Sequence, residues 1–375
     1  MHKPIESSRR PRCFQPSALS QRYRAVVDRL PTSKCEAPHP SALIAHAVFE
    51  RATRQNTFVV SMSIIITADR LTFIRFARKG PPLVPSRFTQ TIEDLFGARD
   101  DVAARAAHEN FPVASRLLPR DIRSKLMAIY AFARLTDDIG DEAEGDRLAL
   151  LDWLDDELTL AGEGNAIHPV FQRLTPVIEE LNLGLAPFRS LIEANRVDQI
   201  VTRYSTFADL VDYCMLSAAP IGHLVLAVFN VSSEQRIEWS DQVCIALQLV
   251  EHLQDVREDA RRGRIYLPME DLHEFHCTED DLLRPETSAD LQRLIAKESL
   301  RALDLLRAGS PLASSLPWQP RLAVSGFVAG GIATVASIVQ ADYDVLSVPC
   351  RPSKRGVAVH MAREFTAATF RKSAA

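Results

Sequence analysis

Two acidic clusters, about a hundred residues apart, hold the side chains of this chain that are best suited to chemistry. The first cluster runs from Asp137 to Asp141, and the second runs from Glu251 through Asp255 to Asp259. Helical positions four apart lie on one face, so each cluster predicts a line of carboxylates. Two such helices facing each other would gather the carboxylates around one cavity, where they repel each other unless a cation separates them. Mg2+ that bridges to a diphosphate suits such hard oxygen ligands.

The second acidic stripe is predicted to be buried. Glu251, Asp255 and Asp259 share one narrow face with Gln248, and most of the remaining helix surface is apolar. A helix that is apolar nearly all round lies in a protein interior. Three buried acids are costly unless a metal or basic groups compensate their charge. For any single aspartate, a solvated helix face is the alternative.

Bulk composition indicates a soluble globular protein. The chain has 375 residues, which allows one large domain or two smaller ones, and it is 46% hydrophobic and 25% charged. Its net charge of −4 gives no reason to expect nucleic acid as a partner. The cysteines lack the CxxC spacing of zinc or redox sites, which favours reduced thiols in a cytoplasmic protein. They are Cys13, Cys35, Cys214, Cys244, Cys277 and Cys350.

Residues 1–98 differ from the rest of the chain, because arginine and proline are frequent and hydrophobic periodicity is poor. We expect a poorly ordered extension, or a true start of the protein further downstream. The stretch from Phe58 to Ile66 could form a strand, but it has no obvious partner. Leu322 to Val339 is just long enough to span a membrane, although its small residues fit a tightly packed bundle helix better.

From about residue 99 the pattern is helical and few stretches alternate with period two. The sequence predicts an all-α bundle over residues 99–349, followed by a basic tail over 350–375 that frays. The predicted helices are Asp121–Gly140, Arg147–Gly162, Pro169–Leu183, Pro187–Thr202, Phe207–Leu216, Ile221–Phe229, Ser240–Arg262, Ser288–Ala308 and Gln319–Ala341.

Three motifs in this order resemble those of squalene and phytoene synthases. Tyr130–Asp141 is similar to the first aspartate-rich motif of that family, and Leu247–Pro268 is similar to the second. Between them, Arg203–Leu210 and Tyr213–Cys214 match the family's middle signature. The resemblance covers about residues 100–350. It implies a class I isoprenoid synthase-like helical bundle with a central cavity.

Within the family, the chain most resembles the hydroxysqualene synthases of the bacterial hopanoid route. The segments that carry this resemblance are Glu109–Ser115, Asp137–Glu142 and Ser217–Gly222. Phytoene synthases and presqualene diphosphate synthases usually carry Asn at the position of Glu251 and Arg at that of Gln254. The resemblance therefore implies Mg2+-dependent conversion of presqualene diphosphate to hydroxysqualene, with release of diphosphate.

The resemblance also implies three groups of functional residues. For each arginine among them, an ion pair with a neighbouring acid is the alternative. Metal ligands would be Asp137, Asp141, Glu251, Asp255 and Asp259. Catalytic residues would be Tyr130, Arg134, Arg203 and Tyr204. Substrate-binding residues would be Asn110, Phe111, Asp138, Asp198, Gln248, Arg264 and Tyr266.

The implied cofactor is Mg2+, and no nicotinamide is expected, since water would quench the final cation and no GxGxxG follows a predicted strand. The implied partners are a prenyl diphosphate substrate and, because that substrate is lipid-like, a membrane surface or enzymes of the same pathway; the expected location is cytoplasmic. Head-to-head prenyl diphosphate coupling on the same fold is the nearest alternative. A non-catalytic assembly factor and a general acidic interaction surface are more distant ones.

Overall fold

The computed structural model describes residues 43–53, 56–67, 70–75 and 118–374, and the chain divides into two compact units, Met1–Pro81 and Pro82–Ala375. The described part of the first unit is an antiparallel sheet in the order β1-β2-β3. The strand predicted at Phe58–Ile66 lies within β2, but the expectation that it has no partner is wrong. β2 pairs with β1 over residues 56–66 and with β3 over residues 62–67. The strands are β1 (Leu43–Thr53), β2 (Asn56–Thr67) and β3 (Arg70–Arg75).

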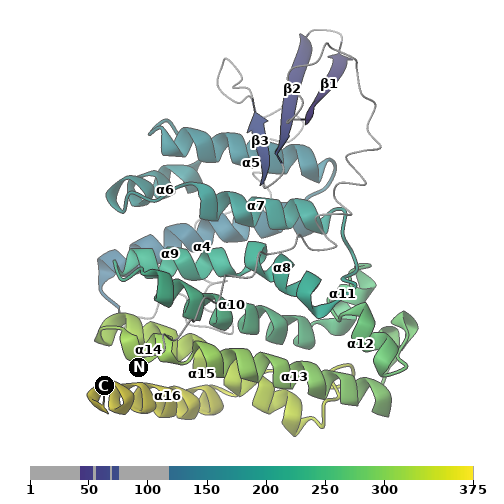
Figure 1. Cartoon of the computed structure of the whole chain (residues 1–375), viewed down its shortest axis with the longest axis vertical. Coiled ribbons are helices and arrows are strands. Elements are labelled where there is room, and N and C mark those ends of the chain that lie inside the picture. Colours follow the sequence, from purple (N-terminus) through teal and green to yellow (C-terminus); the bar gives the residue numbers. More distant parts are fainter. Residues whose placement is uncertain (1–42, 54–55, 68–69, 76–117, 375) are drawn as a thin grey trace, which may run out of the picture. The chain divides into compact units, whose positions relative to one another are not determined.

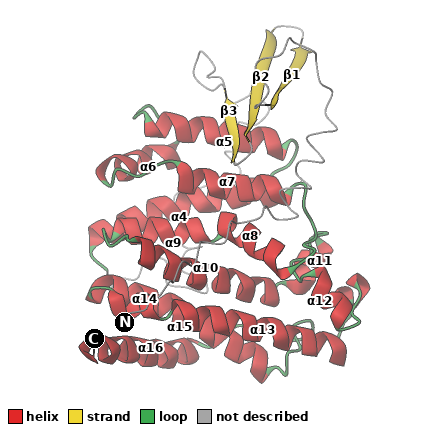
Figure 2. Cartoon of the chain, in the orientation of Figure 1, coloured by secondary structure: helices red, strands yellow, loops and turns green. Residues whose placement is uncertain are grey.

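The described part of the second unit is helical, which confirms the all-α prediction for it (Figure 2). Each predicted helix is present, most of them within a few residues of the predicted ends. The helices are α4 (Arg120–Asp141), α5 (Arg147–Gly162), α6 (Pro169–Glu180), α7 (Ala186–Asp198), α8 (Phe207–Ser217), α9 (Ala219–Val228), α10 (Glu234–Gln254), α11 (Val256–Arg261), α12 (Met269–Glu274), a short 3-10 helix η1 (Glu279–Leu283), α13 (Ala289–Gly309), α14 (Pro311–Ser315), α15 (Trp318–Gln340) and α16 (Lys354–Ala374).

Local caps explain why these helices begin where they do. The side chain of Asp146 accepts a hydrogen bond from the backbone N–H of Ala149 at the start of α5. Thr206 and Asp209 form a reciprocal capping box at the start of α8. Such caps satisfy backbone donors that would otherwise lack partners at a helix start.

Helix α10 lies between two groups of helices in the second unit. In Figure 1, α4 to α7 lie on one side of it and α13 to α16 lie on the other. The first core cluster packs α4, α5, α6, α7 and α9 together, with Phe132 meeting Phe171 and Phe188 edge to face. Further apolar clusters join α10 to the C-terminal helices. The α4 and α10 carboxylates are thus carried by helices with extensive buried cores.

The structure tests two predictions about apolar and C-terminal segments. The tail after residue 350 was expected to fray, and this is wrong for Lys354–Ala374, which forms α16 and packs on α14 and α15. Two stretches, Phe207–Val228 and Trp318–Gln340, are long and apolar enough to cross a membrane, but half of the first and two thirds of the second are buried in the protein. In α15, a side chain at Gly331 would lie 2.7 Å from the Leu247 side chain, so small residues there permit close helix packing, as the sequence predicted.

Candidate active site

Asp137 and Asp138 of the first acidic cluster have different surroundings on α4. Asp137 accepts a hydrogen bond from the Asn195 amide at 3.2 Å and is exposed to solvent. The protein around its carboxyl nevertheless raises its pKa to about 7, mainly by desolvation. Asp138 is instead buried and forms an ion pair with Arg134 at 2.8 Å.

A glycine lets α7 approach the first cluster closely. A Cβ atom at Gly140 would lie 2.0 Å from the Asn195 side-chain oxygen, a distance that no real contact allows. The Gln199 amide also donates to the Gly140 carbonyl at 3.0 Å. Helix α7 therefore supports the part of α4 that carries Asp137 and Asp141.

The second cluster lies at a helix junction rather than within one helix. The helix predicted over Ser240–Arg262 is broken at Asp255, which separates α10 from α11. Backbone hydrogen bonds nevertheless continue across the break, from Asp255 to the Glu251 carbonyl at 3.1 Å and from Asp259 to the Asp255 carbonyl at 2.8 Å. The four-residue spacing of the three acids is therefore kept.

The prediction that this stripe is buried is wrong for two of its members. Glu251 and Asp255 are exposed, and only the Asp259 side chain is mostly covered, at 18% exposure. The apolar residues around the stripe pack on neighbouring helices, whereas the stripe itself faces solvent. The exposure of Glu251 and Asp255 is what a solvent-accessible binding surface requires, and it would not be found in a closed core.

Three carboxyl groups of the candidate site, those of Asp137, Asp255 and Asp259, have raised pKa values. Desolvation raises the pKa of Asp259 to about 8, and the nearby Asp255 charge adds to this effect. Desolvation and the charge of Glu258 also raise the pKa of Asp255. Asp141 contributes in the same direction to the raised pKa of Asp137. A bound cation would relieve this repulsion.

The donor set fits Mg2+ in its chemistry. No group of three or more metal-ligating side chains is assembled within the described residues. Mg2+ usually keeps several waters and uses only one or two carboxylates together with phosphate oxygens. Oxygen donors on two facing clusters are therefore compatible with metal ions that are completed by a diphosphate.

Arg264 connects the two clusters. It follows α11, and its guanidinium forms an ion pair with Asp141 at the end of α4. Its charge also lowers the pKa values of Asp198 and Asp259, against the larger effect of desolvation. The two motifs therefore meet in space, as predicted from their sequence.

An aromatic group lies next to this meeting point. Buried Asp198 accepts hydrogen bonds from the hydroxyls of Tyr213, at 2.7 Å, and Tyr266, at 3.1 Å. The Tyr204 ring lies 5.3 Å from the Tyr213 ring and 5.8 Å from the Tyr266 ring, measured between centroids. We call Asp198 and these three tyrosines the phenol cluster.

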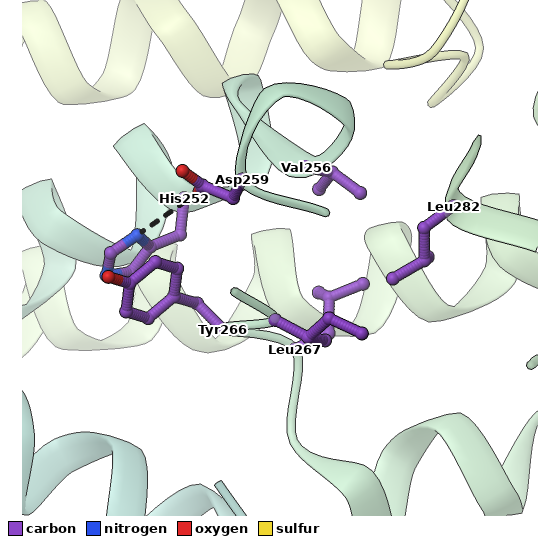
Figure 3. A pocket seen from close by; sticks show the side chains of 7 residues that line it. His252, Val256, Asp259, Tyr266, Leu267 and Leu282 are labelled. Atoms are coloured by element: carbon purple, nitrogen blue, oxygen red, sulfur yellow. Dashed lines mark ion pairs between the residues drawn. The ribbon is translucent and has the colours of Figure 1, made fainter. Parts of the chain in front are cut away.

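His252 joins the phenol cluster to the second acidic cluster. Its ring stacks on Tyr266 at 3.8 Å, and its Nδ1 lies 4.0 Å from the Asp259 carboxylate (Figure 3). Burial lowers the His252 pKa to about 3, so the imidazole is neutral. With Val256, Ile265, Leu267 and Leu282, these residues border a small recess, whose empty space of about 180 Å3 includes open solvent. The recess alone would not hold a long prenyl chain.

The remaining predicted site residues are placed as follows. Tyr130 and Gln248 are half-buried, on α4 and α10, and the Gln248 amide lies 3.4 Å from His252 Nε2. Asn110 and Phe111 lie outside the described residues. Arg203 is not brought to the carboxylates, because it forms a bidentate pair with Glu279 at 2.7 Å and donates to the carbonyls of Thr202 and Gly263.

Sequence reasoning missed Asn195, the hydrogen-bond partner of Asp137. No local pattern pointed to it, because the two residues are 58 positions apart and meet only when α7 packs on α4. Tyr213 belongs to the middle motif of the family resemblance, but its hydrogen bond to Asp198 was not predicted. These contacts depend on tertiary packing rather than on spacing along one helix.

Comparisons with known proteins agree with this geometry. A family model described as squalene/phytoene synthase matches residues 104–360. The chain is 36% identical over 214 residues to the hydroxysqualene synthase of Zymomonas mobilis, covering 56% of this chain and 71% of that protein. It is 34% identical over 231 residues to the phytoene synthase of Arthrospira platensis, covering 58% and 74%.

A solved structure with similar features is the squalene synthase HpnC from Alicyclobacillus acidocaldarius. It is 39% identical, with a TM-score of 0.61, and the match covers 69% of this chain and 97% of that one. The helical bundle and these relatives identify the chain as an isoprenoid synthase, an enzyme that acts on a prenyl diphosphate. The chain belongs to the squalene/phytoene synthase family.

Proposed function

We propose that this enzyme converts presqualene diphosphate to hydroxysqualene and diphosphate in a Mg2+-dependent reaction of hopanoid biosynthesis. The observation that carries the proposal is the position of the phenol cluster beside the paired carboxylates, linked through Arg264. This arrangement puts groups that favour loss of diphosphate next to hydroxyl groups suited to holding water. Relatives named hydroxysqualene synthase, at 36%, 34% and 31% identity, support the same choice.

In this proposal, Mg2+ would neutralise the leaving diphosphate as a Lewis acid. Arg264 would add charge-assisted hydrogen bonds to the diphosphate, exchanging its ion pair with Asp141 for a phosphate oxygen. Arg134 and Asp138 would act as a pair at the edge of the same site, and Tyr130 would lie beside them. The Mg2+ ligands would be Asp137, Asp141, Glu251, Asp255 and Asp259.

The protein itself would control the cation that remains after diphosphate leaves. Aromatic faces attract cations through their quadrupole, and Tyr204, Tyr213 and Tyr266 supply three rings close together. Gln248 would contact the substrate near neutral His252. Asn110 and Phe111 are proposed to contact the substrate on the basis of the family resemblance.

Head-to-head coupling of two prenyl diphosphates is the second candidate, and relatives named phytoene synthase at 34% identity favour it. Two residues argue for the first candidate instead. Glu251 and Gln254 replace the Asn and Arg usual in the coupling enzymes. The Gln254 amide donates to the Cys350 carbonyl at 2.5 Å, so this side chain fixes the C-terminal segment.

We further propose a cytoplasmic enzyme that contacts a membrane surface peripherally, because its substrate is lipid-like.

Product analysis tests the proposal. The purified enzyme is incubated with presqualene diphosphate and Mg2+, or with farnesyl diphosphate and Mg2+, and the extracted products are identified by mass spectrometry. A C30 alcohol formed from presqualene diphosphate without nicotinamide, and lost on chelation, is the expected result. A C30 diphosphate or hydrocarbon made directly from farnesyl diphosphate would overturn it in favour of coupling.

A further inference from the structure

The phenol cluster contains a polar atom that has no use in the fold. The Tyr204 side chain is 99% buried, and its hydroxyl has no hydrogen-bond partner within the part of the chain that the structure describes. Burying an unsatisfied hydroxyl costs about 1–3 kcal/mol. Proteins rarely accept this cost without an unseen partner such as water or a ligand.

The neighbouring hydroxyls are arranged by one carboxylate. Tyr213 and Tyr266 each donate their only O–H to Asp198, one to each of its oxygens. Since a phenol oxygen both donates and accepts, both tyrosines keep lone pairs available to accept a hydrogen bond from a third group. Tyr204, which has a free donor, lies beside them. The three ring centroids lie 5.3 to 5.8 Å apart, so the cluster carries acceptors and a donor within a small volume.

We propose that the phenol cluster holds the water molecule that ends the reaction. In this inference, which rests on the proposed function, Tyr204 is a catalytic residue that contacts the water directly. Asp198 is a positioning residue that acts through Tyr213 and Tyr266.

The chemical step balances without an oxidant or reductant. Departure of diphosphate leaves a C30 carbocation, and the water oxygen supplies the electron pair of the new C–O bond. One O–H bond of that water breaks as the C–O bond forms. Its proton passes to a phenol oxygen, and that phenol passes its own proton to Asp198. The neutral alcohol is then free to leave.

The test separates ionisation from water capture. Diphosphate release from presqualene diphosphate reports ionisation, and the fraction of C30 product that is alcohol reports water capture. For Tyr204→Phe and Asp198→Asn, we expect the alcohol fraction to fall by a larger factor than diphosphate release. The alcohol fraction should fall by about tenfold, as expected for one lost hydrogen bond, in favour of elimination products. Tyr343→Phe is the matched control, because Tyr343 packs on the core cluster that contains Ile338 and Val345, and this change should alter neither readout.

The alternatives give different results. If Tyr204 and Asp198 had only a structural role, their variants would lose diphosphate release and alcohol formation in parallel. The alcohol fraction of the product would then stay unchanged, and this result would overturn the inference. Absence of alcohol from the wild-type enzyme would instead overturn the proposed function itself. If Asp198→Asn does not fold, Tyr204→Phe still decides, because removing an unpartnered hydroxyl should leave the melting temperature unchanged or raise it.

Discussion

The fold holds the two acidic clusters in different ways. In the first, each aspartate has a partner from the surrounding fold: Asn195 for Asp137, Arg134 for Asp138 and Arg264 for Asp141. The second lies at the junction of α10 and α11 and is largely exposed. In our proposal, the fold positions the first cluster, whereas the second cluster depends more on a bound cation.

The largest expected effect comes from the second cluster. Asp255→Asn keeps the size of the side chain but removes its charge, and we expect kcat to fall on the order of a thousandfold, as for other lost transition-state electrostatic contacts. Steady-state kinetics with presqualene diphosphate measure this. Asp304→Asn is the matched control, because Asp304 is exposed and pairs only with Arg307 on the surface. A similar kcat for both variants would remove Asp255 from the site.

A structural change should break the first cluster selectively. Gly140→Ala forces the Asn195 side chain away from α4, and we expect a loss of about 1–3 kcal/mol in the free energy of unfolding from overpacking. Chemical denaturation measures the loss. Gly184→Ala is the control, since nothing lies within 4 Å of a Cβ at that position. Equal stability of the two variants would mean that the α4–α7 contact is looser than described.

The sequence predicted the helices and the meeting of the two clusters, because both follow from periodicity and from the cost of unpaired charge. It did not predict the break at Asp255, since the apolar pattern continues across it. It also failed to predict α16, whose apolar residues do not form a clear stripe. Asn195 and the partners of β2 were missed because they depend on contacts between distant segments.

The pH dependence of stability should sharpen the contrast between the clusters. The folded-state pKa of Asp259 is about 8, above the unfolded value near 3.9, so the folded protein holds a proton that the unfolded chain releases. Stability from this group is therefore complete at low pH and lost as pH rises through about 8. In metal-free protein, melting temperatures should fall less from pH 5 to pH 9 for Asp259→Asn than for the wild type. Saturating Mg2+ should reduce this difference, and identical profiles without metal would contradict the assignment.

The smallest effect is expected at Arg203, a residue that sequence resemblance placed in the catalytic group. Its pair with Glu279 is partly exposed, at 30% and 46%, and such pairs contribute about 0–1 kcal/mol. We expect Arg203→Lys to lower stability slightly and to leave kcat nearly unchanged. Denaturation and steady-state kinetics together test this. A loss of kcat comparable to that of Asp255→Asn would return Arg203 to the catalytic group.

We propose that both acidic clusters hold a single metal–diphosphate unit. Calorimetric titration of Mg2+ and inorganic diphosphate into the wild type, Asp137→Asn, Asp255→Asn and the double variant tests this claim most directly. If the clusters act on one unit, each single variant should lose most of the binding and the double variant should lose little more. Independent, additive losses from the two substitutions would show separate sites and would contradict the claim.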